Sequence, residues 1–135
     1  MSQRFKLRFA YSQIVIYDSV VSQPGCNWTN EHYAQGFVRR EGVVCFGTLL
    51  EYGKAEVEVI YGDYAPRDLT RVIRCPLRLE SGSVCVVGPE EWPEPEDHKL
   101  ALSPGMWSIT CGQSILGPAL PSLVLWFSSS TITES

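Results

Sequence analysis

Hydrophobic and polar residues alternate with a period of two in several stretches of the chain. In Arg4–Phe9 (RFKLRF) apolar residues alternate with basic ones, and in Lys54–Tyr61 (KAEVEVIY) small apolar residues alternate mainly with glutamate. Successive side chains of a β-strand point to opposite faces of its sheet. We therefore expect two half-buried strands here, each with charged side chains on its outer face.

Further apolar runs, each bounded by turn residues, predict the other strands. They are Gln13–Tyr17, Val43–Leu50, Thr70–Leu79, Ser83–Val87, Lys99–Leu102, Gly105–Cys111 and Leu123–Phe127. We expect Val43–Leu50 to be the central strand, and the Tyr52-Gly53 turn predicts a hairpin from Leu49 to Val59. Within the apolar run of Val43–Leu50, Gly47 indicates a bulge or a close backbone approach.

The spacing of the strands indicates the fold class. The chain has about nine or ten short strands at the spacing typical of sandwiches and barrels, without a βαβ rhythm. Pro76 has no backbone N–H, so its strand is an edge strand or contains a bulge. We predict an all-β fold, a single-domain antiparallel β-sandwich over residues 1–128, and expect the Ser/Thr-rich 129–135 to fray. The pattern leaves the order of the strands open.

One short helix is predicted at about residues 30–35. Thr29 is a good N-cap, because its hydroxyl can accept a backbone N–H of the first turn. Trp28 and Tyr33 then occupy the positions of a hydrophobic staple, and Glu31 lies where the helix dipole favours a negative charge. Gly36 can end the helix in the left-handed conformation.

Length and cysteine usage narrow the class of protein. The chain has 135 residues, enough for one domain with one core. No apolar run is long enough to span a membrane, and the first residues lack the apolar segment of a signal peptide. The five cysteines do not form a C-x-x-C motif, so we expect reduced, structural thiols in a cytoplasmic protein.

Acidic residues are concentrated in one segment, Pro89–Asp97 (PEEWPEPED). The net charge of the chain is −4, which argues weakly against nucleic acid as a direct ligand. The segment holds five carboxylates, and its three prolines limit the entropy that would be lost on docking. It suits a strongly cationic partner, although a solubilising loop is the simpler explanation. The candidate contact residues are Glu90, Glu91, Trp92, Glu94, Glu96 and Asp97.

Other candidate residues are less specific. Glu56 and Glu58 are second choices for the partner-binding surface, because they lie on the outward face of the predicted hairpin. His32 could pair with Cys45 as a nucleophile, and His98 could join Glu96 and Asp97 at a metal. We prefer a surface helix residue for His32 and a solvated loop residue for His98, and no motif of a nucleotide, metal or serine-nucleophile enzyme is present. We therefore expect no enzyme activity, no cofactor and no metal.

Four motifs resemble the competence protein J family, also called nuclease inhibitors (Nin). They are W-T-x-x-H-x-x-Q-G-F over 28–37, E-G-x-V-x-F-G-T-L over 41–49, the Y-S-Q that begins at Tyr11, and a late G-x-aromatic-x-aliphatic-T-C over 105–111. The resemblance implies a protein inhibitor of a DNA-entry nuclease, or the immunity partner of a nuclease toxin domain. The match is poor in 63–102, which includes the acidic segment, and it supplies no contact residues.

The leading hypothesis is therefore a protein that binds a bacterial DNase and blocks it with an acidic, DNA-mimicking surface. We expect neither direct nucleic-acid binding nor a membrane association. The alternative is a binding module for a small molecule or carbohydrate, with Trp92, Tyr61 and Tyr64 as a stacking surface. Within 26–49, which is otherwise explained as scaffold, His32, Arg39 and Arg40 are the residues to test at an interface.

Overall fold

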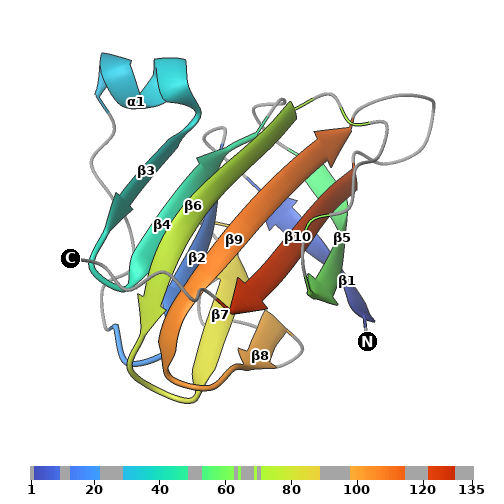
Figure 1. Cartoon of the computed structure of the whole chain (residues 1–135). Coiled ribbons are helices and arrows are strands. Elements are labelled where there is room, and N and C mark those ends of the chain that lie inside the picture. The colour runs from blue at the N-terminus through green and yellow to red at the C-terminus, as the bar shows by residue number, and fades with distance from the viewer. Residues whose placement is uncertain are drawn as a thin grey trace.

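The computed structural model describes residues 2–9, 13–21, 29–48, 53–62, 64, 69, 71–88, 98–114 and 122–129. Its elements are β1 (Ser2–Phe9), β2 (Gln13–Asp18), α1 (Asn30–Gln35), β3 (Phe37–Arg40), β4 (Val43–Gly47), β5 (Gly53–Tyr61), β6 (Arg71–Leu79), β7 (Ser83–Val87), β8 (Lys99–Ala101), β9 (Gly105–Ser114) and β10 (Ser122–Ser129). They form two five-stranded sheets, ordered β1-β5-β10-β9-β6 and β3-β4-β2-β7-β8 (Figure 1). The all-β prediction with one short helix is confirmed.

The pairing of the strands departs from the prediction in two places. The hairpin predicted from Leu49 to Val59 is wrong, because β4 and β5 belong to different sheets. β4 is an inner strand, but β2 is the middle strand of its sheet. The pairs are antiparallel except for β5 and β10, which run parallel, with Val57 opposite Leu123 and Val59 opposite Leu125. Pro76 lies in β6, which is an edge strand as predicted.

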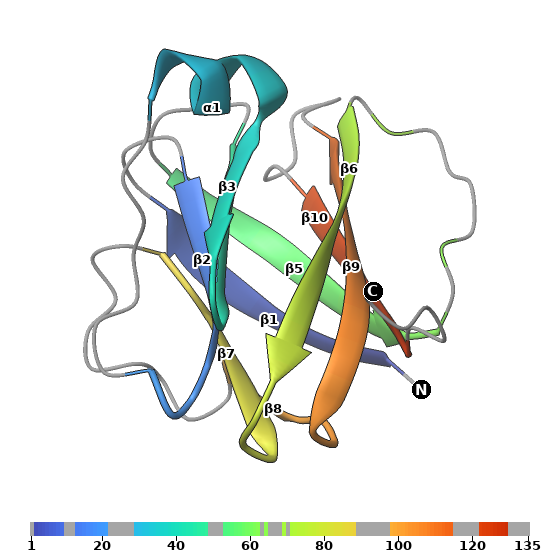
Figure 2. The same ribbon diagram turned by 60° about the vertical axis from the view of Figure 1, so that its left-hand side comes forward.

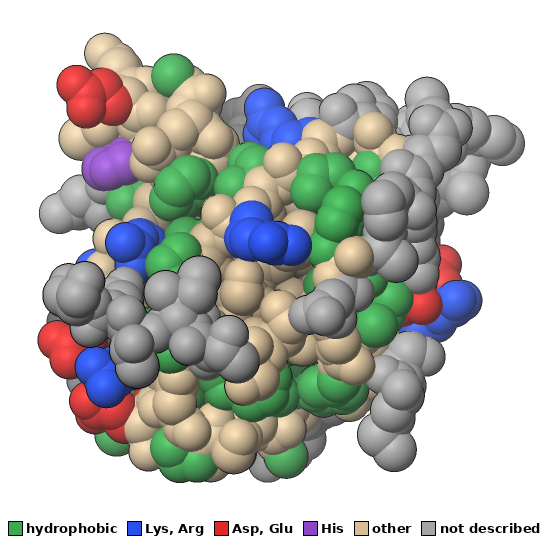
Figure 3. Space-filling view, in the orientation of Figure 1, with side chains coloured by type: hydrophobic (Ala, Val, Ile, Leu, Met, Phe, Trp, Pro, Cys, Tyr) green, Lys and Arg blue, Asp and Glu red, His purple; other side chains and the backbone are tan. Residues whose placement is uncertain are grey.

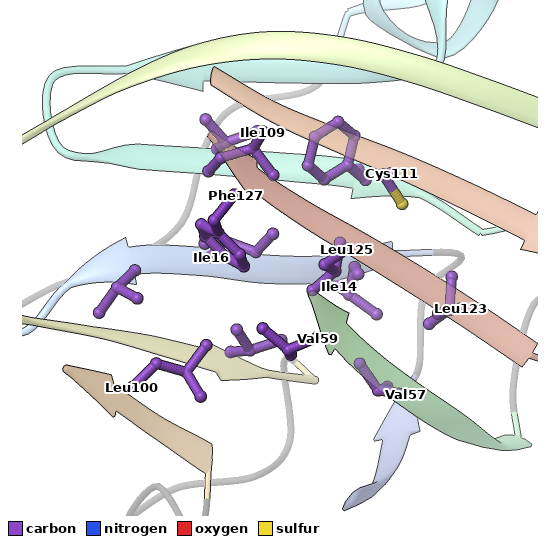
Figure 4. Packing of buried hydrophobic residues seen from close by; sticks show 14 of the residues in the cluster. Ile14, Ile16, Val57, Val59, Leu100, Ile109, Cys111, Leu123, Leu125 and Phe127 are labelled. Carbon is purple, nitrogen blue, oxygen red and sulfur yellow. The ribbon is translucent and has the colours of Figure 1, made fainter. Parts of the chain in front are cut away.

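The main core lies between the two sheets and contains the apolar side of each strand. Ile14 and Ile16 of β2 face residues of β9 and β10, among them Ile109, Leu125 and Phe127 (Figure 4). Each of these five side chains is at most 1% exposed. A smaller cluster lies on the other side of the second sheet; it comprises Val15, Tyr17, Val38, Val43, Cys45, Cys85 and Val87. β2 and β4 are therefore buried on both faces, which explains their unbroken apolar sequences.

The helix is formed as the sequence predicts. The Thr29 hydroxyl accepts the backbone N–H of His32 at 3.3 Å, and the Nδ1 atom of His32 accepts the N–H of Thr29 at 3.1 Å. The two residues thus form a reciprocal capping box. Gly36 ends the helix in the left-handed conformation, with φ at 89°. The predicted staple of Trp28 and Tyr33 lies outside the described side chains.

Gly36 also lies close to the end of β4. Its carbonyl accepts the N–H of Gly47 at 2.7 Å, and the carbonyl of Gly47 accepts the side-chain amide of Gln113 at 2.6 Å. Gln113 belongs to the opposite sheet, so this hydrogen bond ties the two sheets together through a buried amide. The Gly36–Gly47 hydrogen bond continues the regular β3–β4 register, so the bulge or close backbone approach predicted at Gly47 stays a prediction.

Asp18 holds the corner where the chain passes from one sheet to the other. The turn of Glu80, Ser81 and Gly82 connects β6 of the first sheet to β7 of the second. One oxygen of the buried Asp18 carboxylate, Oδ2, accepts the backbone N–H groups of Glu80 at 2.6 Å and Ser81 at 3.2 Å. The other, Oδ1, accepts the hydroxyl of Ser81 and, at 3.4 Å, the N–H of Val20. A single carboxylate therefore satisfies donors that the corner would otherwise leave without an acceptor.

Candidate functional site

The acidic segment 89–97 lies outside the described residues, so Glu90, Glu91, Trp92, Glu94, Glu96 and Asp97 stay predictions. The structure fixes both ends of this segment. It leaves the sheet after Val87, the last residue of β7, and returns at His98, just before β8. The segment therefore connects the last two strands of the second sheet.

His98 anchors the returning end of the acidic segment. Its side chain is 3% exposed, its Nε2 atom lies 3.0 Å from the carbonyl oxygen of Lys6, and its ring lies 4.4 Å from that of Phe5. These contacts join β1 of the first sheet to the β8 edge of the second. They explain His98 as a structural residue, so the prediction of a solvated loop residue is wrong. Among the described residues, no group of three or more histidine, cysteine, aspartate or glutamate side chains is placed to hold a metal ion.

Glu56 and Glu58 lie on the outer face of β5, as predicted, but their charge is partly offset. Arg4 of β1 lies 4.0 Å from the carboxylate of Glu56 and 3.7 Å from that of Glu58. Lys6 and Arg8 are exposed on the same strand, and Lys54 is exposed on β5. This face therefore carries more positive than negative charge, which makes it a weaker DNA mimic than segment 89–97 would be.

His32 and Cys45, the two residues of the enzyme hypothesis, have structural roles. The Nδ1 atom of His32 is occupied by the cap of α1. Cys45 is fully buried in the smaller cluster, on the face of the second sheet that points away from the main core. A hydrolytic pair would need an imidazole nitrogen within hydrogen-bond reach of an accessible thiol. The described residues provide no such pair.

The four described cysteines are free and buried, whereas Cys26 lies outside the described residues. Burial raises the pKa of the Cys75 thiol to about 11, although the nearby charge of Arg39 opposes the shift. Burial likewise raises the pKa of Cys111 to about 12, against the opposing charge of Arg71. Both thiols are protonated at neutral pH and are therefore poor nucleophiles. The prediction of structural cysteines is confirmed for these positions.

Tyr61 and Tyr64, two of the three aromatic residues proposed to stack on a ligand, pack against other rings of the protein. The ring of Tyr64 packs edge-on against Trp126 at 5.0 Å, and that of Tyr61 lies 6.5 Å from Phe127. Burial raises the pKa of Tyr61 above its ordinary value. Trp92, the third of these residues, is outside the described part of the chain.

The structure contains a groove lined by arginines that the sequence did not predict. The first sheet ends at β6 and the second at β3, and these two edges lie on the same side of the sandwich (Figure 2). Between their ends is an open groove of about 430 Å³, which we call the arginine groove. Its lining residues are Arg39, Arg40, Glu41, Gly42, Pro76, Leu77, Arg78 and Met106. Only Arg39 and Arg40 were singled out from the sequence, because Arg78 lies 38 residues further along the chain.

Comparison with known proteins places the chain in a family. The model of the family described as competence protein J (ComJ) matches residues 6–119. The chain belongs to the competence protein J family. The resemblance of its sequence motifs to this family is thereby confirmed. No curated protein sequence matches the chain.

Two solved structures share the fold of this family member. The crystal structure of ComJ from Bacillus subtilis, an inhibitor of the DNA degrading activity of NucA, matches with a TM-score of 0.80 and 14% sequence identity. The match covers 95% of this chain and 96% of ComJ. A protein described as crocagin biosynthetic gene J matches with a TM-score of 0.61 and 16% identity, over 93% of this chain and 96% of that one. In the described part of the family member, no helix is long and apolar enough to cross a membrane.

Proposed function

We propose that this protein is a non-enzymatic inhibitor that binds a bacterial DNA-degrading nuclease and blocks it. The observation that carries the proposal is membership of the competence protein J family, together with a fold shared over 95% of the chain with an inhibitor of NucA. The partner is then a DNA-entry nuclease or the nuclease domain of a toxin.

Inhibition by binding, rather than by catalysis, agrees with the chemistry of the described residues. Cys75 and Cys111 have pKa values of about 11 and 12, so neither is an activated nucleophile. His32 caps a helix and His98 joins the two sheets. Each candidate catalytic group therefore has a structural role that accounts for it.

The acidic segment 89–97 is the surface that we assign to the nuclease. A DNase must present cationic groups to the phosphates of its substrate, and closely spaced carboxylates can occupy the same positions. Glu90, Glu91, Glu94, Glu96 and Asp97 supply five such groups, and Trp92 supplies an apolar anchor among them. The charge would also accelerate association with a cationic partner. Glu56 and Glu58 are the second choice, because Arg4 offsets their charge.

We place the inhibitor in the cytoplasm. Four of its five cysteines are buried as free thiols, a state that a reducing compartment maintains. A cell that makes a DNase needs its inhibitor where its own DNA lies.

The test is inhibition of a nuclease encoded beside the gene for this chain. DNA cleavage is followed with a fluorogenic duplex, and complex formation is followed separately by calorimetry. We expect inhibition that saturates at a fixed molar ratio and weakens with rising salt, because the contact is ionic. Unchanged cleavage at a tenfold molar excess of the protein, with no heat of binding, would exclude this nuclease as the partner.

Charge reversal then tests the surface. A variant with Glu90, Glu91, Glu94 and Glu96 changed to lysine should bind the nuclease at least a hundredfold more weakly and lose the salt dependence. The matched control reverses exposed carboxylates of other segments: Glu31, Glu41 and Glu80. If both variants lose the same affinity, only total charge matters. If inhibition by the first variant is unchanged, the acidic segment is not the contact, although the inhibitor function stands.

A further inference from the structure

The edge strands of the two sheets are joined on one side of the sandwich and separated on the other. At one side the edge strand β1 is joined to the β8 edge by the buried His98, which lies 3.0 Å from the carbonyl of Lys6. At the other side the edge strands β3 and β6 are separated by the arginine groove. Lysine and arginine side chains lie over β3 and β6 on this face, with hydrophobic side chains between them (Figure 3).

Among the described residues, three arginines of this side have no ion-pair partner. In the residues that the structure describes, no carboxylate lies within the 4.0 Å ion-pair distance of Arg39, Arg71 or Arg78. By contrast, Arg4 on the opposite side has two partners, Glu56 and Glu58. A guanidinium carries five N–H donors in a planar fork that matches a carboxylate or a phosphate. The groove therefore offers charged donors to an acceptor from another molecule.

Arg39 lies on the inner side of the edge strand β3, and its side chain is exposed at that edge. Arg39 stands opposite Val44 in the β3–β4 pair, and opposed residues share one face of a sheet. Val44 is part of the core between the sheets. Arg39 lines the groove together with Pro76 and Arg78 of β6, so guanidinium groups of both edge strands face the same groove.

The shape and lining of the groove favour a peptide over nucleic acid. Pro76 and Met106 contribute apolar surface between the arginines, and none of the lining residues that the structure describes carries an aromatic ring on which a base could stack. The net charge of −4 also disfavours a long polyanion. Pro76 has no N–H to offer, so recognition by simple strand addition to β6 is interrupted at its centre. Recognition then depends on side chains.

We propose that the arginine groove binds an extended acidic segment of a partner protein, with carboxylates on Arg39 and Arg78 and an apolar side chain on Pro76 and Met106. This site is separate from the proposed nuclease contact. The acidic segment 89–97 joins β7 to β8 at one end of the second sheet, whereas the groove lies at β3, the other end of that sheet. One protein could thus hold two partners of opposite charge.

The probe is a fluorescein-labelled peptide of alternating glutamate and leucine, about ten residues long so that it can span β6. Binding is measured by fluorescence polarisation, and the Nε–Hε signals of the arginines are followed by NMR. We expect the signals of Arg39 and Arg78 to shift, while those of Arg4 and Arg8 stay in place. Affinity should fall as salt rises.

Two variants of equal charge provide the decisive comparison. Arg39→Glu with Arg78→Glu should weaken peptide binding at least tenfold, whereas Lys6→Glu with Lys54→Glu, on the opposite side, should leave it unchanged. Urea midpoints of both variants establish that they are folded. Equal losses in the two variants, or no binding by the unmodified protein, would overturn the proposal. It would also be overturned if a glutamine analogue of the peptide bound equally well, or if single-stranded DNA displaced the peptide and moved the same signals.

Discussion

Asp18 should contribute more to the stability of the sandwich than any exposed charge, because it holds the corner between the sheets. The backbone donors of Glu80 and Ser81 depend on its carboxylate. Asp18→Ala leaves these two N–H groups without their acceptor. Each such loss costs about 1–3 kcal/mol, so we expect the free energy of unfolding to fall by about 2–6 kcal/mol. That is a large part of the roughly 5–15 kcal/mol that stabilises a domain.

Asp18→Asn removes the charge of the side chain but keeps its shape, so it tests the contribution of the charge alone. One amide oxygen can still accept the N–H groups of Glu80 and Ser81, but the charge is lost and the amide nitrogen faces the N–H of Val20. Hydrogen bonds to a charged group are worth about 1.5–3 kcal/mol against about 1 for neutral ones. We expect a loss of about 1–2 kcal/mol. Glu80→Gln is the control, because its side chain is exposed and only its backbone is used; it should change stability by less than about 0.5 kcal/mol.

The effect of Asp18 should depend on pH in a defined direction. Burial alone would raise the pKa of Asp18, but the hydrogen bonds from Ser81, Glu80 and Val20 outweigh it and lower the pKa below 3.8. A lowered pKa contributes stability that is fully present above the unfolded value of about 3.9 and is lost as the pH falls through the folded value. The difference between the unmodified protein and Asp18→Asn should therefore be constant from pH 5 to 7 and shrink toward pH 3.

Urea unfolding followed by circular dichroism measures these differences. With a slope of about 1–3 kcal/mol per molar urea, a loss of 3 kcal/mol lowers the midpoint by about 1–3 M. Two results would refute the reasoning. One is a midpoint of Asp18→Ala within 0.3 M of that of Glu80→Gln at pH 7. The other is a difference between Asp18→Asn and the unmodified protein that is as large at pH 3 as at pH 7.

Three further predictions use the same unfolding assay or a thiol reagent. Thr29→Ala removes the N-cap of α1 and should cost about 1 kcal/mol, whereas Thr29→Ser should be almost neutral; equal losses would show that the hydroxyl is not used. Gly112→Ala places a methyl group 2.5 Å from the side chain of Leu69, so stability should fall by about 1–3 kcal/mol, and a neutral result would mean that the Leu69 side chain can turn aside. Cys75 and Cys111 should resist a thiol reagent at pH 7 until urea unfolds the chain, and rapid labelling of the folded protein would contradict their raised pKa values.

Local features of this protein follow from its sequence alone. The alternation in Arg4–Phe9 and Lys54–Tyr61 predicts which side chains are buried in β1 and β5, because the period of a strand is fixed by its backbone. Thr29 and Gly36 predict both ends of α1, since each satisfies the geometry of one helix terminus without help from the rest of the fold. Pro76 predicts an edge strand for the same kind of local reason.

Tertiary structure decides what depends on residues far apart in the chain. A short turn between two strands can close a hairpin or carry the chain to the opposite sheet, which is why the predicted hairpin of β4 and β5 is wrong. The parallel pair of β5 and β10 joins strands some sixty residues apart, and no local pattern records such a partner. Likewise, Asp18 finds its donors at Glu80 and Ser81, and the arginine groove combines residues of β3 and β6. The β5–β10 pair forms only when the first sheet assembles, and the other two contacts form only after the two sheets have packed.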